Sequence, residues 1–182
     1  MSDHVRRSAG LAAAGLALAL SLAGCDLYDL QAWPEDADGY AVAYVVDGDT
    51  IDVTDPGGDT QRVRLLGINT PEVEHGGEVA QCGGEEAAAQ LSELLPEGTP
   101  VELVADSRAD DTDRYDRLLR YVETEDGTDV GGELVAGGYA YPWAPRSEPE
   151  PERTADYQTA AAEAQEVGAG SWASCPELDE SR

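Results

Sequence analysis

Three short clusters of this sequence place charged side chains beside the ends of predicted strands. The first cluster is Asp47-Gly48-Asp49-Thr50. A glycine between two aspartates permits a tight turn that can aim a carboxylate into a cleft, and carboxylate oxygens are hard ligands that suit Ca²⁺. Because Asp-Gly is also a strong signal of a β-hairpin, this cluster alone indicates either a turn or a metal site.

The second cluster spans residues 64–72 and joins a strand arginine to a carboxylate that follows a proline. The guanidinium of Arg64 is suited to bidentate binding of a phosphate. Pro71 fixes the backbone of the turn, so Glu72 is a candidate general base on a stiff support. A surface ion pair between Arg64 and Glu72 would explain the same residues without any catalysis.

The third cluster, residues 113–120, gathers arginines around a tyrosine. Arg117 supplies a second guanidinium, Arg114 adds a further positive charge, and the ring of Tyr115 offers a surface for stacking a base. Six of the nine arginines that follow residue 24 lie in or beside the second and third clusters: Arg62, Arg64, Arg108, Arg114, Arg117 and Arg120. In so acidic a chain, this concentration of positive charge indicates an anionic substrate.

The elements that must position these clusters are mostly short strands. Alternating and β-branched apolar residues predict the strands, which are 40–46, 50–54, 61–66, 101–105 and 118–124. Helical spacing and stop signals predict helices, which are 85–95, a short turn at 133–136, and 153–167. Residues 140–143 are predicted to be extended. Five strands interrupted by about three helices predict an α+β fold built on a five-stranded OB-like β-barrel.

Residues 1–24 have the pattern of a signal peptide. The pair Arg6-Arg7 precedes an uncharged Ala/Leu/Gly run at 11–22, which is shorter than the ~20 residues that a membrane-spanning helix needs. Small residues then lead directly into Cys25, which we expect to carry a lipid; a plain cleaved signal with an incidental cysteine is the alternative. The arginine pair also resembles a twin-arginine export signal, and the general secretory route remains open. We therefore expect an extracellular protein, lipid-anchored to the outer face of the cell membrane.

The rest of the chain has room for one domain of ordinary size. Residues 25–38 are acidic and rich in turn formers, which predicts a tether, and residues 39–175 contain every predicted strand and helix. Residues 176–182 are predicted to be a tail. We expect a monomer.

Acidic residues outnumber basic ones along the whole chain, 38 against 11. Without residues 1–24 the counts are 37 and 9, a net charge of −28, and lysine is absent. Self-repulsion on this scale destabilises a compact state unless salt screens it, and at 1 M salt the Debye length falls to about 3 Å. We therefore expect a hypersaline setting, and the composition is similar to that of proteins from salt-loving archaea.

Once Cys25 is assigned to a lipid, two cysteines remain. Cys82 and Cys175 form an even pair in an exported protein, which predicts a disulfide. Zinc binding is the alternative, although two isolated thiols without Cys-x-x-Cys spacing make a poor zinc site. The two histidines are His4, in the predicted signal peptide, and His75, so nothing supports catalysis by a histidine triad.

Taken together, the three clusters resemble, in order and in separation, the signatures of the staphylococcal (thermonuclease) nuclease family. The resemblance covers residues 40–172 and continues through residues 134–140 and the late helix to Ser171-Trp172. It implies a nuclease that hydrolyses phosphodiester bonds of DNA and RNA with Ca²⁺ as cofactor.

The resemblance also implies a set of metal ligands. Asp49 and Asn69 would bind Ca²⁺ through their side chains, and Thr70 would bind it through its backbone carbonyl. Asn69 stands where the best-known member of the family has aspartate, so the site loses one negative charge. We therefore expect this chain to bind calcium more weakly.

The remaining site residues are carried over in the same way. Arg64 and Arg117 would clamp the scissile phosphate, and Glu72 would position or deprotonate the attacking water. The nucleotide beside the cut would be held by Asp113, Arg114 and Tyr115. Asp116 departs from the family, which often has a small residue there, and its carboxylate lies beside the phosphate clamp.

Two other classes of protein compete with the nuclease. A non-catalytic OB module would bind nucleic acid without cleaving it, but such degenerate domains typically lose the arginine and glutamate set that this chain keeps. A purely structural surface lipoprotein would not need arginines gathered at strand ends. Of the three, the sequence favours the nuclease.

Overall fold

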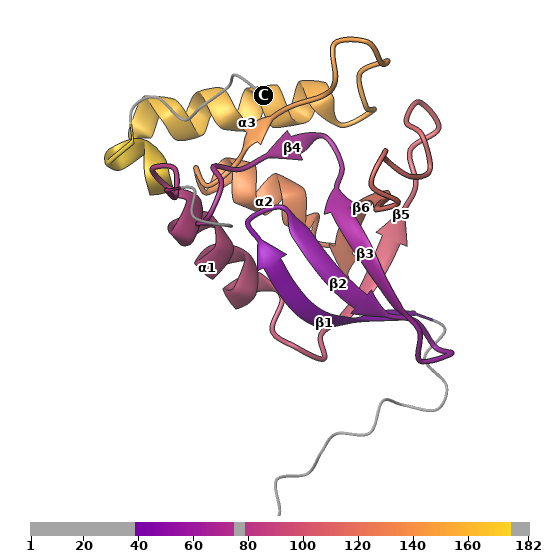
Figure 1. The fold of residues 1–182 in the computed structure, drawn as a ribbon. Helices are drawn as coiled ribbons and strands as arrows, with labels where there is room; N and C mark the ends of the chain where they lie inside the picture. Colours follow the sequence, from indigo (N-terminus) through magenta and orange to yellow (C-terminus); the bar gives the residue numbers. More distant parts are fainter. Residues whose placement is uncertain (1–38, 75–78, 176–182) are drawn as a thin grey trace, which may run out of the picture. The chain divides into compact units, whose positions relative to one another are not determined.

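A computed structural model describes residues 39–74 and 79–175 (Figure 1). The predicted signal peptide, the lipid-bearing Cys25, the acidic tether, His75 and the C-terminal tail lie outside the described residues. Among the described residues, no helix is long and apolar enough to cross a membrane.

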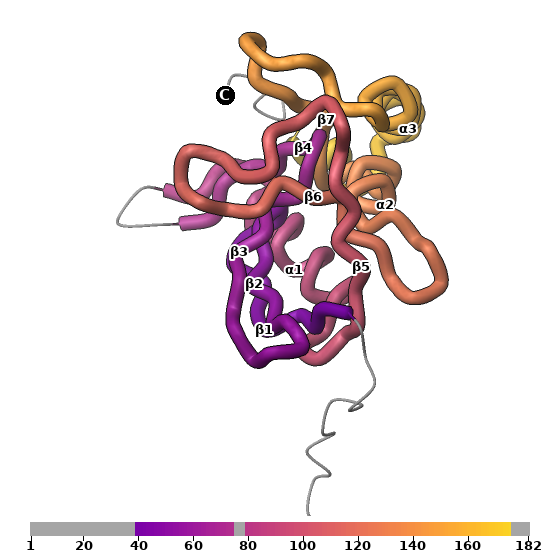
Figure 2. Tube along the Cα trace, turned by 90° about the vertical axis from the view of Figure 1, so that its right-hand side faces the viewer, coloured from indigo at the N-terminus to yellow at the C-terminus, as the bar shows by residue number. Residues whose placement is uncertain are grey.

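Five strands close into a barrel, as the sequence predicted. The neighbouring strands follow the order β1-β2-β3-β6-β5, and β5 pairs with β1 to close the ring. Their bounds are β1 Tyr40–Asp47, β2 Thr50–Thr54, β3 Thr60–Leu65, β5 Pro100–Val104 and β6 Leu118–Thr124. Figure 2 shows β2 and β3 on one side of the barrel and β5 on the other. The predicted OB-like α+β fold is therefore confirmed.

The β3–β6 pair is the one parallel pair among the described strands of the barrel, and it brings the second and third clusters together. Val63 pairs with Leu118, and Arg64 pairs with Leu119. Since Arg117 immediately precedes β6, its backbone lies beside β3, close to Arg64 in register. The other described strand pairs of the barrel are antiparallel, which is typical of small barrels with short connections.

A second sheet of two very short strands lies at the end of the barrel that carries the turn between β1 and β2 (Figure 1). β4 (Ile68–Asn69) pairs antiparallel with β7 (Tyr141–Pro142). The sequence predicted residues 140–143 as extended but did not predict β4. This small sheet sets the course of the chain immediately before Glu72.

Among the described residues, three α-helices and a 3-10 helix accompany the barrel. They are α1 Gly84–Leu94, α2 Val130–Ala136, α3 Thr154–Val167 and η1 Gly170–Ala173. Helix α1 packs on β1 and α2 on β6, while α3 packs on α2 and β7 and η1 on α3. α2 is longer than the predicted turn at 133–136, because Asp129 caps it by accepting a hydrogen bond from the Gly132 amide. Packing of α2 against α3 and β6 also compensates for the poor helix propensity of Gly131 and Gly132.

The core fills the barrel and continues under the helices. Inward-facing strand residues such as Ile51, Val63 and Val122 are fully buried, and so are Leu91 of α1 and Leu134 of α2. Burial of these side chains fixes the strand register, since a shift by one residue would expose them. The barrel is therefore a rigid support for the polar side chains at its end.

Candidate active site

The guanidinium of Arg64 lies at the centre of a buried polar cluster at the end of the barrel. Its Nη1 donates hydrogen bonds to the carbonyl oxygens of Leu65 at 2.7 Å and Ile68 at 2.9 Å. Its Nη2 lies 2.9 Å from Oδ2 of Asp49 and donates to Oδ1 of Asn69 at 2.8 Å. The acidic partner that the structure gives Arg64 is thus Asp49, and the guanidinium bridges two of the residues that were predicted to bind calcium.

Asp49 is held by the same segment that leads to Glu72. Its Oδ2 accepts hydrogen bonds from the backbone amide of Thr70 at 3.0 Å and from the Thr70 hydroxyl at 3.3 Å, and Oδ1 accepts from Thr50. The glycine beside it is required for close packing, because a Cβ atom on Gly48 would lie 2.6 Å from Oγ1 of Thr70 and 2.8 Å from Cβ of Ala87. The Asp-Gly-Asp cluster is therefore both a turn and part of the site.

Asn69 directs its amide group inward. Its Nδ2 donates to the hydroxyl of Tyr141 at 2.7 Å and to the carbonyl oxygen of Thr70 at 3.0 Å. That carbonyl is the one predicted to bind calcium, so in this arrangement it accepts a hydrogen bond from Asn69. An aspartate at this position could not donate these bonds, which gives the expected weaker calcium affinity a second physical cause.

The oxygen donors of this cluster fit a hard divalent cation by their chemistry. The Asp49 carboxylate accepts hydrogen bonds from Thr70 and shares the Arg64 guanidinium with Oδ1 of Asn69, while Asp47 accepts from the Asp49 amide. Carboxylate and carbonyl oxygens are ligands that suit Ca²⁺. Burial raises the pKa of Asp47 to about 6, and the negative charge of Asp49 acts in the same direction. Two carboxylates are fewer than a self-sufficient cage, and no group of three or more His, Cys, Asp or Glu side chains placed to hold a metal occurs among the described residues.

Glu72 follows directly from this cluster and is half-buried. Pro71 before it is buried, and the backbone amide of Glu72 donates to Oε1 of Gln81 at 2.8 Å. The candidate general base is thus two residues from Thr70, whose amide is bound to Asp49. The structure brings Asp49, Arg64, Asn69, Thr70 and Glu72 to one end of the barrel.

Arg117 belongs to a second group, on the loop that enters β6. Its Nε and Nη2 bind Oδ2 of Asp113 at 2.7 Å and 2.6 Å. Oδ1 of Asp113 also accepts from the amides of Tyr115 and Arg117. Burial acts to raise the pKa of Asp113, but these hydrogen bonds outweigh it and hold the pKa below its usual value. Asp113 therefore shapes the loop and orients Arg117, and its contact with substrate stays a prediction.

Tyr115 and Arg114 stand on the surface of this loop. The Tyr115 ring is 63% exposed, Arg114 lies over it at 4.7 Å from the ring centroid, and Arg117 lies at 5.4 Å. Asp116 adopts a left-handed backbone with φ of 60° and is exposed. Aspartate tolerates this conformation better than most residues, although glycine adopts it at no steric cost. The turn explains why a small residue is favourable at position 116.

Most of the described arginines are paired with carboxylates. Among the described residues, seven arginine–carboxylate contacts occur, and apart from the two already given they join Arg62 to Asp52, Arg108 to Glu152, Arg120 to Asp111, and Arg153 to Glu123 and Asp129. Arg64 lies at the carboxylate cluster, whereas Arg117 is held by Asp113 at the start of β6, the strand that pairs with β3. The anionic substrate inferred from the gathering of arginines stays a prediction.

The cysteine pair is joined. Cys82 and Cys175 form a disulfide whose Cα atoms are 5.8 Å apart and 93 residues apart in sequence. The bond links Cys82, which directly follows Gln81, with Cys175, which lies two residues after the end of η1.

Three residues of the site were not assigned roles from sequence. Tyr141 reaches Asn69 from a strand of two residues, and Gln81 reaches Glu72 across a loop, so no local pattern marks either one. Asp47 did carry a signal, because it is the first carboxylate of the Asp-Gly-Asp cluster. It binds the Asp49 amide through Oδ1 at 3.0 Å.

Comparison with known proteins agrees with this arrangement. Residues 62–174 match the model of the family described as staphylococcal nuclease homologue. The chain is similar to the endonuclease YhcR of Bacillus subtilis (strain 168), with 35% identity over 122 residues, which is 63% of this chain and 10% of that protein. It is also similar to the SPbeta prophage-derived endonuclease YokF of the same strain, with 41% identity over 95 residues, or 52% of this chain and 31% of that protein.

A shorter relative is the thermonuclease of Staphylococcus hyicus, with 37% identity over 83 residues, covering 46% of this chain and 47% of that protein. The chain therefore spans between a tenth and about half of the length of the curated relatives that it matches.

Proposed function

Because the chain belongs to the staphylococcal nuclease homologue family, we propose that it hydrolyses phosphodiester bonds of DNA or RNA with calcium. The observation that carries the proposal is the convergence of Asp49, Arg64, Asn69 and Thr70 at the barrel end that leads into Glu72. The names of the relatives, endonuclease and thermonuclease, support the same activity.

Each residue of the site has a separate role in this proposal. Asp49, Asn69 and Thr70, with Asp47 beside them, would hold Ca²⁺, which when bound supplies positive charge to polarise the phosphate. Arg64 is anchored through Nη1 to two backbone carbonyls, so its guanidinium stays at the site when Nη2 exchanges partners.

Glu72 accepts a proton from the attacking water at its carboxylate. Arg64, together with Arg117 delivered by the adjacent strand β6, stabilises the charge that develops on the phosphate oxygens. Asp113 releases or shares the guanidinium of Arg117 as the phosphate arrives, since both anions compete for the same N–H donors.

The experiment that tests the catalytic assignment is Glu72→Gln, which keeps the shape of the side chain and removes the base. We expect kcat for DNA hydrolysis to fall by roughly 100-fold or more, because general bases typically contribute that much. Glu74→Gln, at an exposed glutamate two residues away, is the matched control and should retain full activity. Equal activity of Glu72→Gln and wild type would refute the assigned role.

The same assay separates nuclease from binding module. Nucleic acid bound with or without calcium, and never cleaved, would favour a non-catalytic OB domain.

We also propose that the protein acts outside the cell, held to the membrane by a lipid on Cys25, in concentrated salt. The support is the order of residues 1–25 and the net charge of −27 of the whole chain. Cys25→Ser should move the protein from the membrane fraction to the medium in the producing organism. Retention of the variant in the membrane fraction would contradict the anchor.

A further inference from the structure

The backbone of Glu72 is clamped by Gln81 through two reciprocal hydrogen bonds. The amide of Glu72 donates to Oε1 of Gln81 at 2.8 Å, and the amide of Gln81 donates to the carbonyl oxygen of Glu72 at 2.8 Å. One residue therefore satisfies both backbone polar groups of the candidate base. Since Pro71 restricts the backbone on the other side, Glu72 is fixed from two directions.

The first residue of α1 packs directly on this clamp. A Cβ atom on Gly84 would lie 2.3 Å from the carbonyl oxygen of Glu72, 2.7 Å from its carbonyl carbon and 3.1 Å from the carbonyl oxygen of Pro71. Any side chain at position 84 would displace the backbone of Glu72. The first residue of α1 is thus in direct packing contact with the backbone of Glu72.

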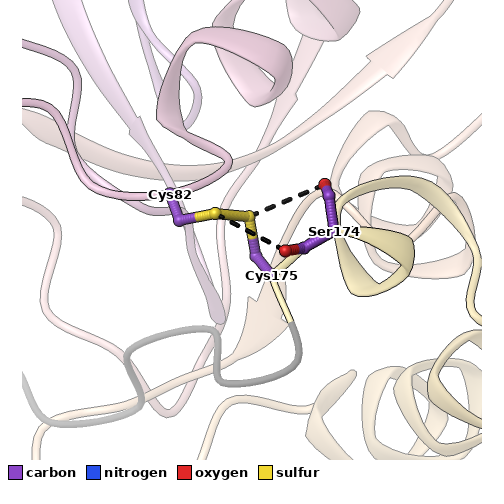
Figure 3. Close-up of a disulfide and its surroundings, with 3 residues drawn as sticks. All are labelled: Cys82, Ser174 and Cys175. Carbon is purple, nitrogen blue, oxygen red and sulfur yellow. Dashed lines mark hydrogen bonds between the residues drawn. A yellow bond between two sulfur atoms is a disulfide. The ribbon is translucent and has the colours of Figure 1, made fainter.

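The disulfide links the segment just before α1 to the C-terminal end of the domain (Figure 3). Cys82 follows Gln81 directly and bonds to Cys175, whose amide donates to the carbonyl oxygen of Ser171 at 2.7 Å. A Cβ atom on Gly83 would lie 2.9 Å from Oγ of Ser171 and 3.4 Å from Cγ of Pro71. Residues 81–84, which contact the backbone of Glu72, therefore lie between Pro71 and η1. The disulfide joins them covalently to Cys175.

We propose that Gln81 is a positioning residue for Glu72 and that the Cys82–Cys175 disulfide anchors it. This rests on the proposed function, in which Glu72 handles the proton of the attacking water. A general base acts only when its oxygen is held within a fraction of an ångström of the productive position. The phosphate-binding arginines have separate supports, so loss of the clamp lowers kcat and leaves KM unchanged.

The first test compares three variants of the full chain at high salt with calcium and a DNA substrate. Gln81→Met keeps the length of the side chain and removes the acceptor, and we expect kcat to fall roughly 10-fold to 100-fold. Gln81→Glu keeps an oxygen acceptor for the Glu72 amide and should recover most of kcat. Gln90→Met makes the same change at a half-buried glutamine of α1 away from Glu72, and should behave as wild type.

The second test measures hydrogen exchange of the Glu72 amide, which reports on the clamp without any catalysis. Exchange should become faster in Gln81→Met and in the double variant Cys82→Ser/Cys175→Ser, while amides of the barrel strands keep their protection. Reduction of the wild-type disulfide should lower kcat in the same direction as the double variant.

The outcomes separate this proposal from the proposed function. A wild-type protein that cleaves no nucleic acid with calcium would refute the nuclease, while faster exchange at Glu72 in Gln81→Met would still support the clamp. Unchanged exchange in Gln81→Met would overturn the clamp. A fall in kcat shared equally by Gln90→Met, or matched by a rise in KM, would overturn the positioning role.

Discussion

Arg64 has a structural role as well as the catalytic one proposed for it. Its side chain is 10% exposed, its partner Asp49 is 9% exposed, and it makes four contacts with the segment from Asp49 to Asn69. Removing one partner of a buried ion pair leaves the other charge uncompensated, which costs about 3–5 kcal/mol. Loss of activity in a variant of Arg64 is therefore not by itself proof of catalysis.

Arg117 provides the contrast. Its side chain is 26% exposed and pairs with Asp113 four residues earlier, an arrangement that contributes only about 1 kcal/mol or less. We expect Arg64→Ala to lower the free energy of unfolding by about 3–5 kcal/mol and Arg117→Ala by about 1 kcal/mol, with both variants losing activity. Urea unfolding at high salt measures the difference. Equal stability of the two variants would show that Arg64 is not held as described.

The motifs fix the order and separation of the candidate site residues, so the sequence could propose them, and the structure brings Asp49, Arg64, Asn69 and Thr70 together. Their partners could not be named. Arg64 bonds to the carbonyl of Ile68, four residues away, and to Asp49 in the turn between β1 and β2, and Asn69 reaches Tyr141 from a separate segment. Such pairings depend on the register of β2 against β3 and on the pairing of β4 with β7, which no local pattern encodes.

At the scale of the elements, a polar network attaches the start of α3 to the barrel. Asp106 accepts hydrogen bonds from the Tyr121 hydroxyl at 2.6 Å, the Glu152 amide at 2.6 Å and the Arg108 amide at 2.8 Å. Arg153 lies over the Tyr121 ring at 4.1 Å. Burial acts to raise the pKa of Asp106, but the hydrogen bonds outweigh it and hold the pKa below its usual value.

This network should make part of the stability depend on pH. Since the pKa of Asp106 is lower in the folded state, its contribution is present above the unfolded pKa of about 4 and is lost as pH falls through the folded value. Asp106→Asn should cost about 1–3 kcal/mol at pH 7, with the difference from wild type shrinking below about pH 4. Asp110→Asn, at an exposed aspartate of the same loop, is the control. A pH-independent difference would contradict the charged form of Asp106.

The long elements were the predictable ones. The strands of the barrel were found within a residue or two because inward and outward side chains alternate along them. β4 has two residues and exists through its pairing with β7, so periodicity could not reveal it, whereas β7 falls within residues 140–143, which were predicted to be extended. α2 was underestimated because its glycines oppose helix formation, whereas burial of Val130 and Leu134 supports it.

At the scale of the whole molecule, negative charge is the dominant feature. The chain has 38 acidic residues against 11 basic ones, so the arginine–carboxylate pairs of the described part neutralise only a minority of the carboxylates. The remaining repulsion is screened by salt, because the Debye length falls from about 10 Å at 0.1 M to about 3 Å at 1 M.

We therefore expect the thermal midpoint of the domain to rise steadily from 0.1 M to 2 M NaCl. Screening, rather than a special effect of chloride, is the cause, so KCl should act in the same way as NaCl. Calorimetry over the two salt series measures the trend. A midpoint that falls or stays constant would contradict the role given to self-repulsion.

The central claim is that the cluster around Asp49 and Glu72 cleaves nucleic acid with a bound divalent cation. The most direct measurement is DNA hydrolysis by the purified protein in 2 M salt, titrated with CaCl₂ after removal of metals by a chelator. The account predicts no cleavage without calcium, a saturable rise as calcium is added, and a shift of that rise to lower calcium in Asn69→Asp, which restores the missing charge. Cleavage that persists in excess chelator would contradict this prediction. So would a wild-type protein and an Asn69→Asp variant that both fail to respond to calcium.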